Sequence, residues 1–372
     1  MSREPSRRAF LARAMQGVGA GLAMPYVLAS AALGAAGKAP ASDRVATGHI
    51  GVGGRGGGLL RHVVRLPSAM PIAVCDIDQN RLAGARRAAG GNARTYHDFR
   101  ELLEAKDIDA VVVASPDHWH PLHTIHACKA GKDVYCEKPL SVTVLEGQRM
   151  VEAARRHGTE CLVFSSSAAV YGPPDVTPIP EDHPHRPISP YGYTKSAFER
   201  VLSDFAAAYP LRSISLRYFN AAGADMAGRA GERHDPETHL IPIVLQHLRG
   251  QRDHIYVFGT DYPTHDGSCI RDYIHINDLA AAHVLAVEAL AEGAETTRMN
   301  VGTGEGCSVL QVIAAAERVT GIRADVIEAE RREGDPPVLV ADPSRITEAL
   351  GWQPQHSSLE PIIESAWKWE TR

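Results

Sequence analysis

The stretch "VEAARRHGTECLVFSSSAAVYG", Val151 to Gly172, decides how this 372-residue chain divides. Its first part, up to Gly158, continues the pattern of the segments before it. Its second part is a short apolar run, "CLVF", followed by three serines, which indicates a buried strand. The motifs before and after this stretch differ in kind. We therefore expect the chain to change from one α/β pattern to another near residue 158.

The bulk composition is that of a globular protein. Hydrophobic residues make up 44% and charged residues 22% of the chain, and its length indicates about two domains. The net charge of −5 argues against a nucleic-acid partner, which would require a basic face. The six cysteines are scattered singly, without a CxxC pair, which indicates reduced thiols.

Residues 1–43 differ from the rest of the chain. Arg7 and Arg8 precede an uncharged run rich in Gly and Ala, which resembles a twin-arginine export signal. The alternative is a membrane anchor, because about 20 apolar residues can span a bilayer. The run is weakly apolar and contains Pro25, so we favour a cleaved signal and expect no stable membrane span. A used signal implies a periplasmic protein, and an unused one implies a cytoplasmic protein.

A glycine-rich segment, "GHIGVGGRGGGLL", follows this run. Gly51, Gly53 and Gly56 lie between a short apolar strand and a helix-like segment, where glycines allow the backbone to approach a pyrophosphate. The next apolar segment, "PIAVCDID", ends at Asp76, which is placed to bind a ribose and to repel a 2′-phosphate. These features predict NAD as a cofactor. The alternatives are a loop without a ligand, an aspartate that only caps a helix, and a GxxGxxG spacing of the same glycines.

Residues 44–158 resemble the nucleotide-binding domain of the glucose–fructose oxidoreductase and inositol dehydrogenase family. The motifs that carry this resemblance are "IGVGGRG", "CDID", "PDHWH" and "EKPL". The resemblance implies a Rossmann domain in which Lys138, from "EKPL", lies beside the nicotinamide and the substrate. The second domain of that family, a large open sheet with a catalytic histidine, has no counterpart in the rest of this chain.

Four histidines lie within or shortly after the "PDHWH" motif: His118, His120, His123 and His126. Closely spaced imidazoles can bind zinc, but no cysteine or carboxylate completes a set of ligands here. We therefore expect no metal site.

A helix start of a different kind lies in "SPYGYTKSAFERVLSDFAAAY". Ser189 is a good N-cap, Pro190 suits the first helical position, and Tyr191 and Lys195 fall on one face. The Lys195 ammonium can lower the pKa of the Tyr191 phenol, and Ser167 can hydrogen-bond the same phenol. This spacing predicts a catalytic set. The alternative is a surface tyrosine beside a solvated lysine.

Residues 161–372 resemble the UDP-glucose 4-epimerases, which are extended short-chain dehydrogenases. The resemblance continues through "SISLRYFNAAGAD", "DPETHLIPIVLQ", "YVFGTDYPTHDGSCIRDYIHINDLAAAH", "NVGTGEGCSVLQVI" and "RREGDPPVLVADPSRI". It implies that Tyr191 accepts the proton of the sugar 4-hydroxyl, that Ser167 shares it, and that Lys195 binds the cofactor ribose. It also implies a homodimer formed through a helix bundle that includes the Tyr191 helix.

The same resemblance implies a site for the UDP group of a UDP-sugar. Forked guanidinium groups suit a diphosphate. The alternative for these arginines is surface ion pairing with Asp272 or Glu333. The implied residues are Asn220, His239, Leu240, Phe258, Arg271, Tyr273, Arg332 and Asp335.

The junction of the two patterns creates a geometric conflict. In the epimerase pattern the serine strand lies beside the strand that corresponds to "AVVVAS", but here "DVYCEKP" lies between them in the chain. In a single sheet that follows chain order, the serine strand would move by about 4.8 Å. Reacting atoms need to approach to about 3–3.5 Å. We therefore expect Tyr191 to be displaced from the nicotinamide, unless that strand moves or a partner chain supplies the cofactor.

We thus expect an α/β protein with a composite Rossmann-type doubly wound parallel sheet and a smaller C-terminal nucleotide-sugar-binding subdomain. Its divisions would be a signal segment at 1–43, an NAD-binding half at 44–158 and a catalytic half at 159–372. The leading hypothesis is an NAD-dependent UDP-glucose 4-epimerase, an isomerase. The alternatives are a truncated NAD(P)-dependent oxidoreductase that acts on a sugar or polyol, and a catalytically silent nucleotide-binding protein.

Overall fold

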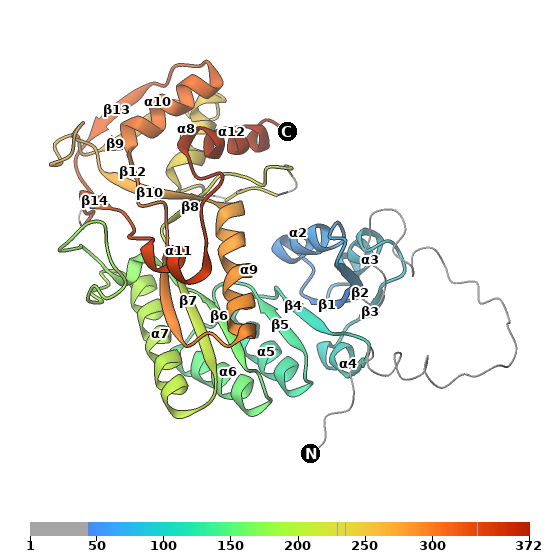
Figure 1. Cartoon of the computed structure of the whole chain (residues 1–372). Coiled ribbons are helices and arrows are strands. Elements are labelled where there is room, and N and C mark those ends of the chain that lie inside the picture. The colour runs from blue at the N-terminus through green and yellow to red at the C-terminus, as the bar shows by residue number, and fades with distance from the viewer. Residues whose placement is uncertain (1–43, 229, 235, 333) are drawn as a thin grey trace, which may run out of the picture. The chain divides into compact units, whose positions relative to one another are not determined.

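The computed structural model describes residues 44–372 except 229, 235 and 333 (Figure 1). These residues form two compact units. Unit 1 ends at Leu140, and unit 2 begins at Ser141. The predicted export signal lies outside the described residues. No helix in the described part of the chain is long and apolar enough to cross a membrane.

Unit 1, residues 44–140, contains a five-stranded sheet with the order β3-β2-β1-β4-β5. Every neighbouring pair of strands is parallel, as in a doubly wound fold. In chain order its elements are β1 (Val45–Ile50), α2 (Gly54–Val63), β2 (Ala69–Cys75), α3 (Gln79–Ala88), β3 (Arg94–Tyr96), α4 (Phe99–Glu104), β4 (Ala110–Val113), the 3₁₀ turn η3 (Asp117–Trp119), α5 (His120–Lys129) and β5 (Asp133–Cys136).

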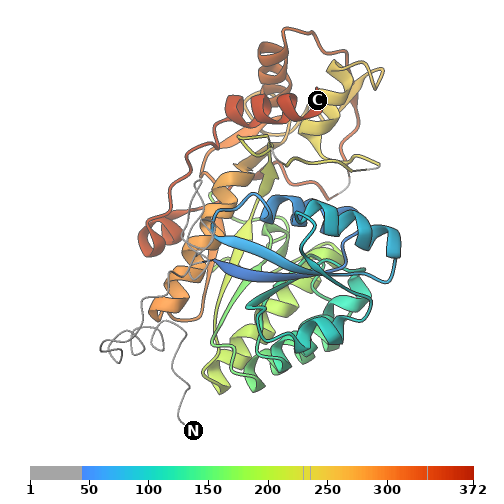
Figure 2. The ribbon, with the colours of Figure 1, turned by 90° about the vertical axis from the view of Figure 1, so that its right-hand side faces the viewer.

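Helices cover both faces of the unit 1 sheet (Figure 2). Successive residues of a strand point to opposite faces. Ala73 and Cys75 accordingly pack in the core beneath α4, whereas Val74 packs with Leu60 and Leu82 of α2 and α3. This alternation buries both faces and explains why the central strands β2 and β4 are apolar along their length.

Unit 2, residues 141–372, contains a three-stranded parallel sheet, β11-β7-β6, a mixed sheet, β12-β10-β14 with β8 beside β10, and the parallel pair β13-β9. Its elements are α6 (Val144–Arg156), β6 (Cys161–Ser165), η4 (Ala168–Val170), α7 (Pro190–Ala208), β7 (Arg212–Tyr218), β8 (Asn220–Ala222), α8 (Leu240–Leu248), β9 (Ile255–Phe258), β10 (Ile270–His275), α9 (Ile276–Glu292), β11 (Thr297–Val301), β12 (Gly306–Ser308), α10 (Val309–Thr320), β13 (Val326–Ala329), β14 (Val338–Leu339), α11 (Ser344–Leu350) and α12 (Leu359–Glu370).

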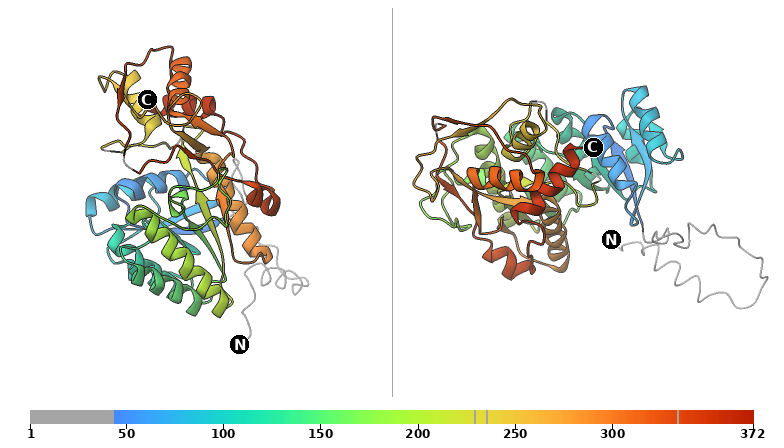
Figure 3. Two further views of the ribbon diagram at one scale, coloured as in Figure 1. Left: turned by 90° about the vertical axis from the view of Figure 1, so that its left-hand side faces the viewer. Right: turned by 90° about the horizontal axis from the view of Figure 1, so that it is seen from above.

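Unit 2 contains two large apolar cores, beside a smaller cluster around Val170, Tyr171 and Ile179. The first joins β7 and β11 to α9 through residues such as Ile214, Leu216 and Met299. The second lies where α8, α10 and α12 pack against one another (Figure 3). It includes Leu245, Val312 and Ile363. The second core supports the smaller C-terminal part that the sequence predicts.

The predicted α/β class with parallel sheets is confirmed. Both edges of β4 are occupied, by β1 and by β5. The serine strand β6 instead pairs with β7 and is an edge strand of the β11-β7-β6 sheet.

The units divide at Leu140, whereas the sequence places the change of pattern near 158. The difference arises because α6 packs on α7 within unit 2. A Cβ atom at Gly147 of α6 would lie 2.9 Å from Cε2 of Phe198 on α7, so the two helices approach closely. The helix that precedes the serine strand is therefore part of unit 2.

Candidate active site and cofactor-binding loop

The glycine-rich loop of unit 1 requires glycine at two positions. Gly51 has a φ of +81°, and a Cβ atom there would lie 2.5 Å from the Ser115 amide nitrogen. A Cβ atom at Gly56 would lie 1.8 Å from the carbonyl oxygen of Gly51. At Gly54 a Cβ atom would meet nothing within 4 Å. The geometry therefore selects the GxGxxG reading over GxxGxxG.

This loop fits a dinucleotide. Helix α2 starts after Gly53, whose N-cap position has no side-chain hydrogen bond, and the N–H groups of such a helix start can bind a pyrophosphate. Asp76 follows β2, is buried, and accepts hydrogen bonds from the amides of Val52 at 2.9 Å and Asp78 at 3.0 Å. Asp78, not Asp76, caps α3. A backbone cradle with an ordered carboxylate beside it is the arrangement that NAD requires.

Lys138 follows β5 and is exposed. Its neighbour Glu137 is buried and accepts from Arg55 at 3.0 Å and from the Tyr135 hydroxyl at 3.1 Å. Arg55 lies in the first turn of α2, which begins directly after Gly53, so this contact places the start of the "EKPL" segment at the same sheet edge as the glycine-rich loop.

The histidines of unit 1 have structural contacts. Both ring nitrogens of His120 contact carbonyl oxygens, those of Pro139 at 2.7 Å and Ser115 at 2.8 Å. His123 lies 3.0 Å from the Ser115 hydroxyl and stacks on Trp119. These contacts explain the positions of the two imidazoles without a metal ion.

The predicted catalytic residues come together in unit 2. Ser189 caps α7 by accepting from the Gly192 amide at 3.1 Å, and Pro190 occupies the first turn, as predicted. Tyr191 hydrogen-bonds to the side chain of Ser167, which lies just beyond the end of β6. Lys195, one turn further along α7, donates to the Ser165 carbonyl at 2.8 Å.

The pKa of the Tyr191 phenol differs from the sequence expectation. Partial burial raises this pKa, and the hydrogen bond from Ser167 opposes the rise. The Lys195 ammonium lies 5.5 Å from the centre of the Tyr191 ring and is hydrogen-bonded to Ser165. The expected lowering by Lys195 is therefore wrong for this arrangement. Ser167 is the group that favours the phenolate here.

A buried polar network lies beneath these residues, and the sequence analysis did not single it out. Arg217 of β7 is fully buried and binds Glu199 of α7 through two nitrogens, the shorter contact being 2.6 Å. Glu199 also accepts from the Ser166 hydroxyl at 2.5 Å. Ser166 lies between Ser165 and Ser167, so the network holds the end of β6. Two signals pointed to it: Glu199 is four residues after Lys195, and Arg217 interrupts an apolar strand.

The residues implied for UDP binding lie around β9 and β10. Asn220 and Tyr273 are partners in the β8–β10 pairing, and the Asn220 amide donates to the Asp272 carbonyl at 3.0 Å. The Arg332 guanidinium lies 4.0 Å from the centre of the Phe258 ring. His239 is the N-cap of α8, directly before Leu240.

Arg271 is not paired with Asp272, the neighbour considered from sequence. It donates to Asp335 at 2.9 Å and to the Pro336 carbonyl at 2.9 Å, and its side chain is largely buried. Asp272 instead accepts from the amides of Thr303, Gly304 and Ala341. Two of the implied UDP-binding residues, Arg271 and Asp335, are thus direct neighbours.

The segment before α8 contains a cluster of imidazoles and carboxylates that the sequence analysis did not identify. Glu232, His234, Glu237 and His239 each place one ligand atom within 4.8 Å of the others. Each imidazole of this cluster contacts a carboxylate, for example His234 to Glu232 at 3.0 Å, and the two imidazole rings also contact one another. Both histidine side chains are about half exposed.

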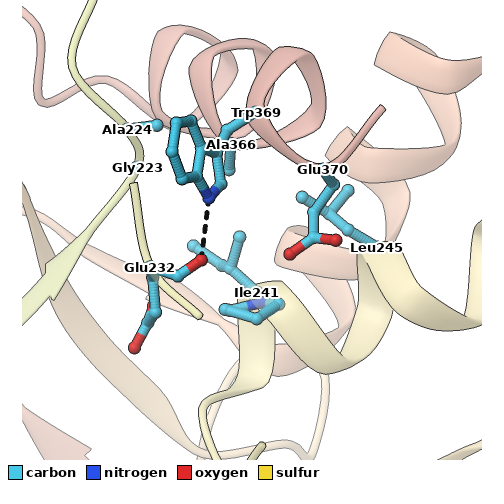
Figure 4. A pocket seen from close by; sticks show the side chains of 9 residues that line it. Gly223, Ala224, Glu232, Ile241, Leu245, Ala366, Trp369 and Glu370 are labelled. Carbon is cyan, nitrogen blue, oxygen red and sulfur yellow. Dashed lines mark hydrogen bonds between the residues drawn. The ribbon is translucent and has the colours of Figure 1, made fainter. Parts of the chain in front are cut away.

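A small pocket lies beside this cluster, between Gly223, Ala224, Glu232 and the helices α8 and α12 (Figure 4). The Trp369 indole donates to the Glu232 carbonyl at 2.9 Å across it. Ile241, Leu245 and Ala366 form apolar parts of its wall. None of the predicted site residues lines this pocket, so the candidate site is defined by the contacts around β6, β9 and β10.

Comparisons with known proteins agree with this geometry. Residues 71–302 match the NAD dependent epimerase/dehydratase family. A UDP-glucose 4-epimerase of Rhizobium meliloti (strain 1021) is 49% identical over 223 residues, 60% of this chain and 68% of the relative. One of Lacticaseibacillus casei is 36% identical over 329 residues, 86% of this chain and 96% of the relative.

Solved structures show the same relationship. A UDP-glucose 4-epimerase from Stenotrophomonas maltophila, with bound NAD and formylated UDP-arabinopyranose, has a TM-score of 0.67 at 30% identity, with 88% of this chain and 98% of that one covered. One from Brucella ovis in complex with NAD has a TM-score of 0.65 at 36% identity, with 87% and 98% covered. The chain belongs to the NAD dependent epimerase/dehydratase family.

Proposed function

We propose that this chain is an NAD-dependent UDP-glucose 4-epimerase, which interconverts UDP-glucose and UDP-galactose. The observation that carries the proposal is the arrangement of Tyr191 at the start of α7, with Ser167 hydrogen-bonded to it and Lys195 one turn further on. Its relatives of known structure include epimerases with NAD and UDP-sugars, which supports the choice of cofactor and substrate.

In the proposed reaction the residues of the chain move one proton. Tyr191 takes the proton of the sugar 4-hydroxyl and later returns it, and Ser167 stabilises the phenolate by donating to its oxygen. Lys195, one turn further along α7, would bind a hydroxyl of the cofactor ribose. NAD, when bound, supplies the reversible hydride transfer that converts the sugar between alcohol and ketone at C4.

The glycine-rich loop of unit 1 would hold NAD through Gly51, Gly53 and Gly56, with Asp76 at the ribose. The UDP group would lie against the β9 and β10 region. There Phe258 and Arg332 provide a stacked surface and Arg271 provides the guanidinium for the diphosphate. Asn220, His239, Leu240, Tyr273 and Asp335 would complete this site.

A coupled assay tests the proposal. The purified chain without residues 1–43 is given UDP-galactose, and the appearance of UDP-glucose is followed while bound NAD is measured in the same sample. Turnover supports the epimerase. A folded protein that holds NAD but shows no turnover with UDP-galactose or UDP-glucose contradicts it.

We further propose that residues 44–158 derive from the oxidoreductase family named above, so that the chain is a fusion. The edge position of β5 and the Glu137–Arg55 contact support this origin. In that family Lys138 would contact the nicotinamide, so Lys138→Ala should weaken NAD binding. A truncated oxidoreductase remains the alternative function, and oxidation of a free sugar or polyol with NAD(P) would favour it.

Two further proposals follow from the sequence. The twin-arginine-type segment would export the chain to the periplasm, which fractionation of cells that express the full chain would test. The α7 surface would support a homodimer, which light scattering of the purified protein would test. A monomer at micromolar concentration would contradict the second proposal.

A further inference from the structure

A buried phenol without a hydrogen-bond partner lies in the loop between β9 and β10. Tyr262 is 5% exposed, and in the described part of the chain its hydroxyl has no hydrogen-bond partner. Burying an unsatisfied hydroxyl costs about 1–3 kcal/mol. Such a group in a native fold calls for an explanation.

The Tyr262 ring is held firmly by its surroundings. Its amide donates to the Gly267 carbonyl at 2.9 Å, and its own carbonyl accepts from the Thr264 amide at 2.7 Å. The Arg331 guanidinium lies 4.3 Å from the ring centre and is itself anchored on Asp261 at 2.6 Å. The direction of the hydroxyl is therefore fixed before any ligand binds, and little side-chain entropy is lost when it forms a bond.

The charges around Tyr262 belong to the proposed UDP site. Its loop runs from Phe258 to Arg271, two residues of that site. Burial raises the pKa of Tyr262, the charge of Asp335 adds to the rise, and the charges of Arg331 and Arg271 oppose it. The phenol is thus within electrostatic reach of the Arg271–Asp335 pair and stays protonated as a hydrogen-bond donor at neutral pH.

Two neighbouring arginines repeat one arrangement. Arg331 lies over Tyr262 as Arg332 lies over Phe258, at 4.3 Å and 4.0 Å from the ring centres. Phe258 lacks a polar atom on its side chain, whereas Tyr262 offers one donor. The region therefore contains one apolar ring, that of Phe258, and one ring, that of Tyr262, whose hydroxyl can donate a hydrogen bond to an anion.

We propose that Tyr262 is a further binding residue for the UDP-sugar, with its hydroxyl donating a hydrogen bond to a phosphate oxygen of the diphosphate. This inference rests on the proposed function. A phosphate oxygen carries negative charge, so the bond is of the stronger, charge-assisted kind. The ligand satisfies the buried hydroxyl, and Arg271 supplies the formal positive charge beside it.

Tyr262→Phe in the full chain tests the inference, with affinities for UDP and for uridine measured by calorimetry. The Kd for UDP should rise about tenfold, the expected effect of losing one hydrogen bond to a charged group. The affinity for uridine should stay the same, because uridine has no phosphate. The melting temperature should not fall, because the hydroxyl has no partner within the protein.

Tyr256→Phe is the matched control, because Tyr256 lies on β9 and is 48% exposed. It should leave all three measurements unchanged. An unchanged UDP affinity in Tyr262→Phe overturns the inference, and an equal loss for UDP and uridine overturns the assignment to the diphosphate. If the unaltered chain fails to bind UDP, the proposed function fails and this inference falls with it. The unaltered protein therefore distinguishes the two failures.

Discussion

The candidate site of unit 1 is formed mainly by backbone atoms, whereas that of unit 2 is formed mainly by side chains. The cofactor loop of unit 1 is mostly backbone: Gly51 and Gly56 bring the chain within contact distance of itself, and α2 offers free N–H groups. The catalytic end of β6 in unit 2 depends on side chains, with Arg217 and Glu199 buried beneath it.

This difference determines what each site tolerates. A backbone cradle accepts changes of charge but not added volume, because a Cβ atom would collide with a carbonyl oxygen. A buried ion pair accepts little change in charge, because removal of one partner leaves the other uncompensated. Substitutions of each kind should therefore separate cofactor binding from catalysis.

The largest expected effect is that of Tyr191→Phe. Removal of the phenolic oxygen abolishes the proton transfer, so turnover should fall about 10²- to 10⁴-fold. The side chain is 52% exposed, so the melting temperature and NAD content should stay the same. Tyr193→Phe, 65% exposed and two residues further on, is the control in the coupled assay. An unchanged rate in Tyr191→Phe would show that the Tyr191 hydroxyl does not transfer the proton.

The buried pair is the next most sensitive feature. Glu199→Gln leaves Arg217 buried without its countercharge, and the free energy of unfolding should fall by about 3–5 kcal/mol. Urea unfolding gives this value directly. Glu152→Gln on the neighbouring helix α6 is the control, because its contacts with Arg149 and Arg156 are exposed and contribute about 1 kcal/mol or less. Equal effects of the two substitutions would show that the buried ion pair of unit 2 contributes no more to stability than an exposed one.

Local features of both sites could be predicted from the sequence. The cap by Ser189, the glycine spacing and the grouping of Tyr191 with Lys195 depend on residues close together in the chain. Strand pairing was harder to predict from the sequence. The strands β5 and β6 follow one another in the chain, yet β5 pairs with β4 and β6 pairs with β7.

The electrostatics of the site depend on burial, which one sequence does not reveal. The spacing of Tyr191 and Lys195 correctly placed both on one helix turn, but the pKa of the phenol follows from its partial burial and from Ser167. Arg217 was visible as a charge within an apolar strand. Glu199 was visible as a carboxylate one turn after Lys195, but its pairing with Arg217, 18 residues further on, depends on how α7 packs against β7.

Gly56→Ala should affect unit 1 alone. The added methyl group would lie 1.8 Å from the Gly51 oxygen, so the loop must shift, and NAD affinity should fall about 100-fold, or about 2.7 kcal/mol. Gly54→Ala adds the same group where a Cβ atom meets nothing within 4 Å, and should change nothing. Calorimetry with NAD and with UDP separates the units, because UDP affinity should stay the same in both variants. Loss of UDP binding in Gly56→Ala would contradict the division of roles.

The smallest expected effect is a pH dependence of stability from unit 1. Burial lowers the pKa of His49 from 6.5 to about 4. Between pH 4 and pH 6.5 the His49 imidazole is therefore protonated in the unfolded chain and neutral in the folded chain. Stability therefore rises with pH through this window and levels off above about pH 6.5, and His49 should account for about 2 kcal/mol between pH 7.5 and pH 5. His49→Val should reduce that pH difference in urea unfolding, whereas His118→Gln, at an exposed site, should not. An identical pH difference in His49→Val and the unaltered chain would show that burial of His49 does not keep its imidazole neutral in the folded protein.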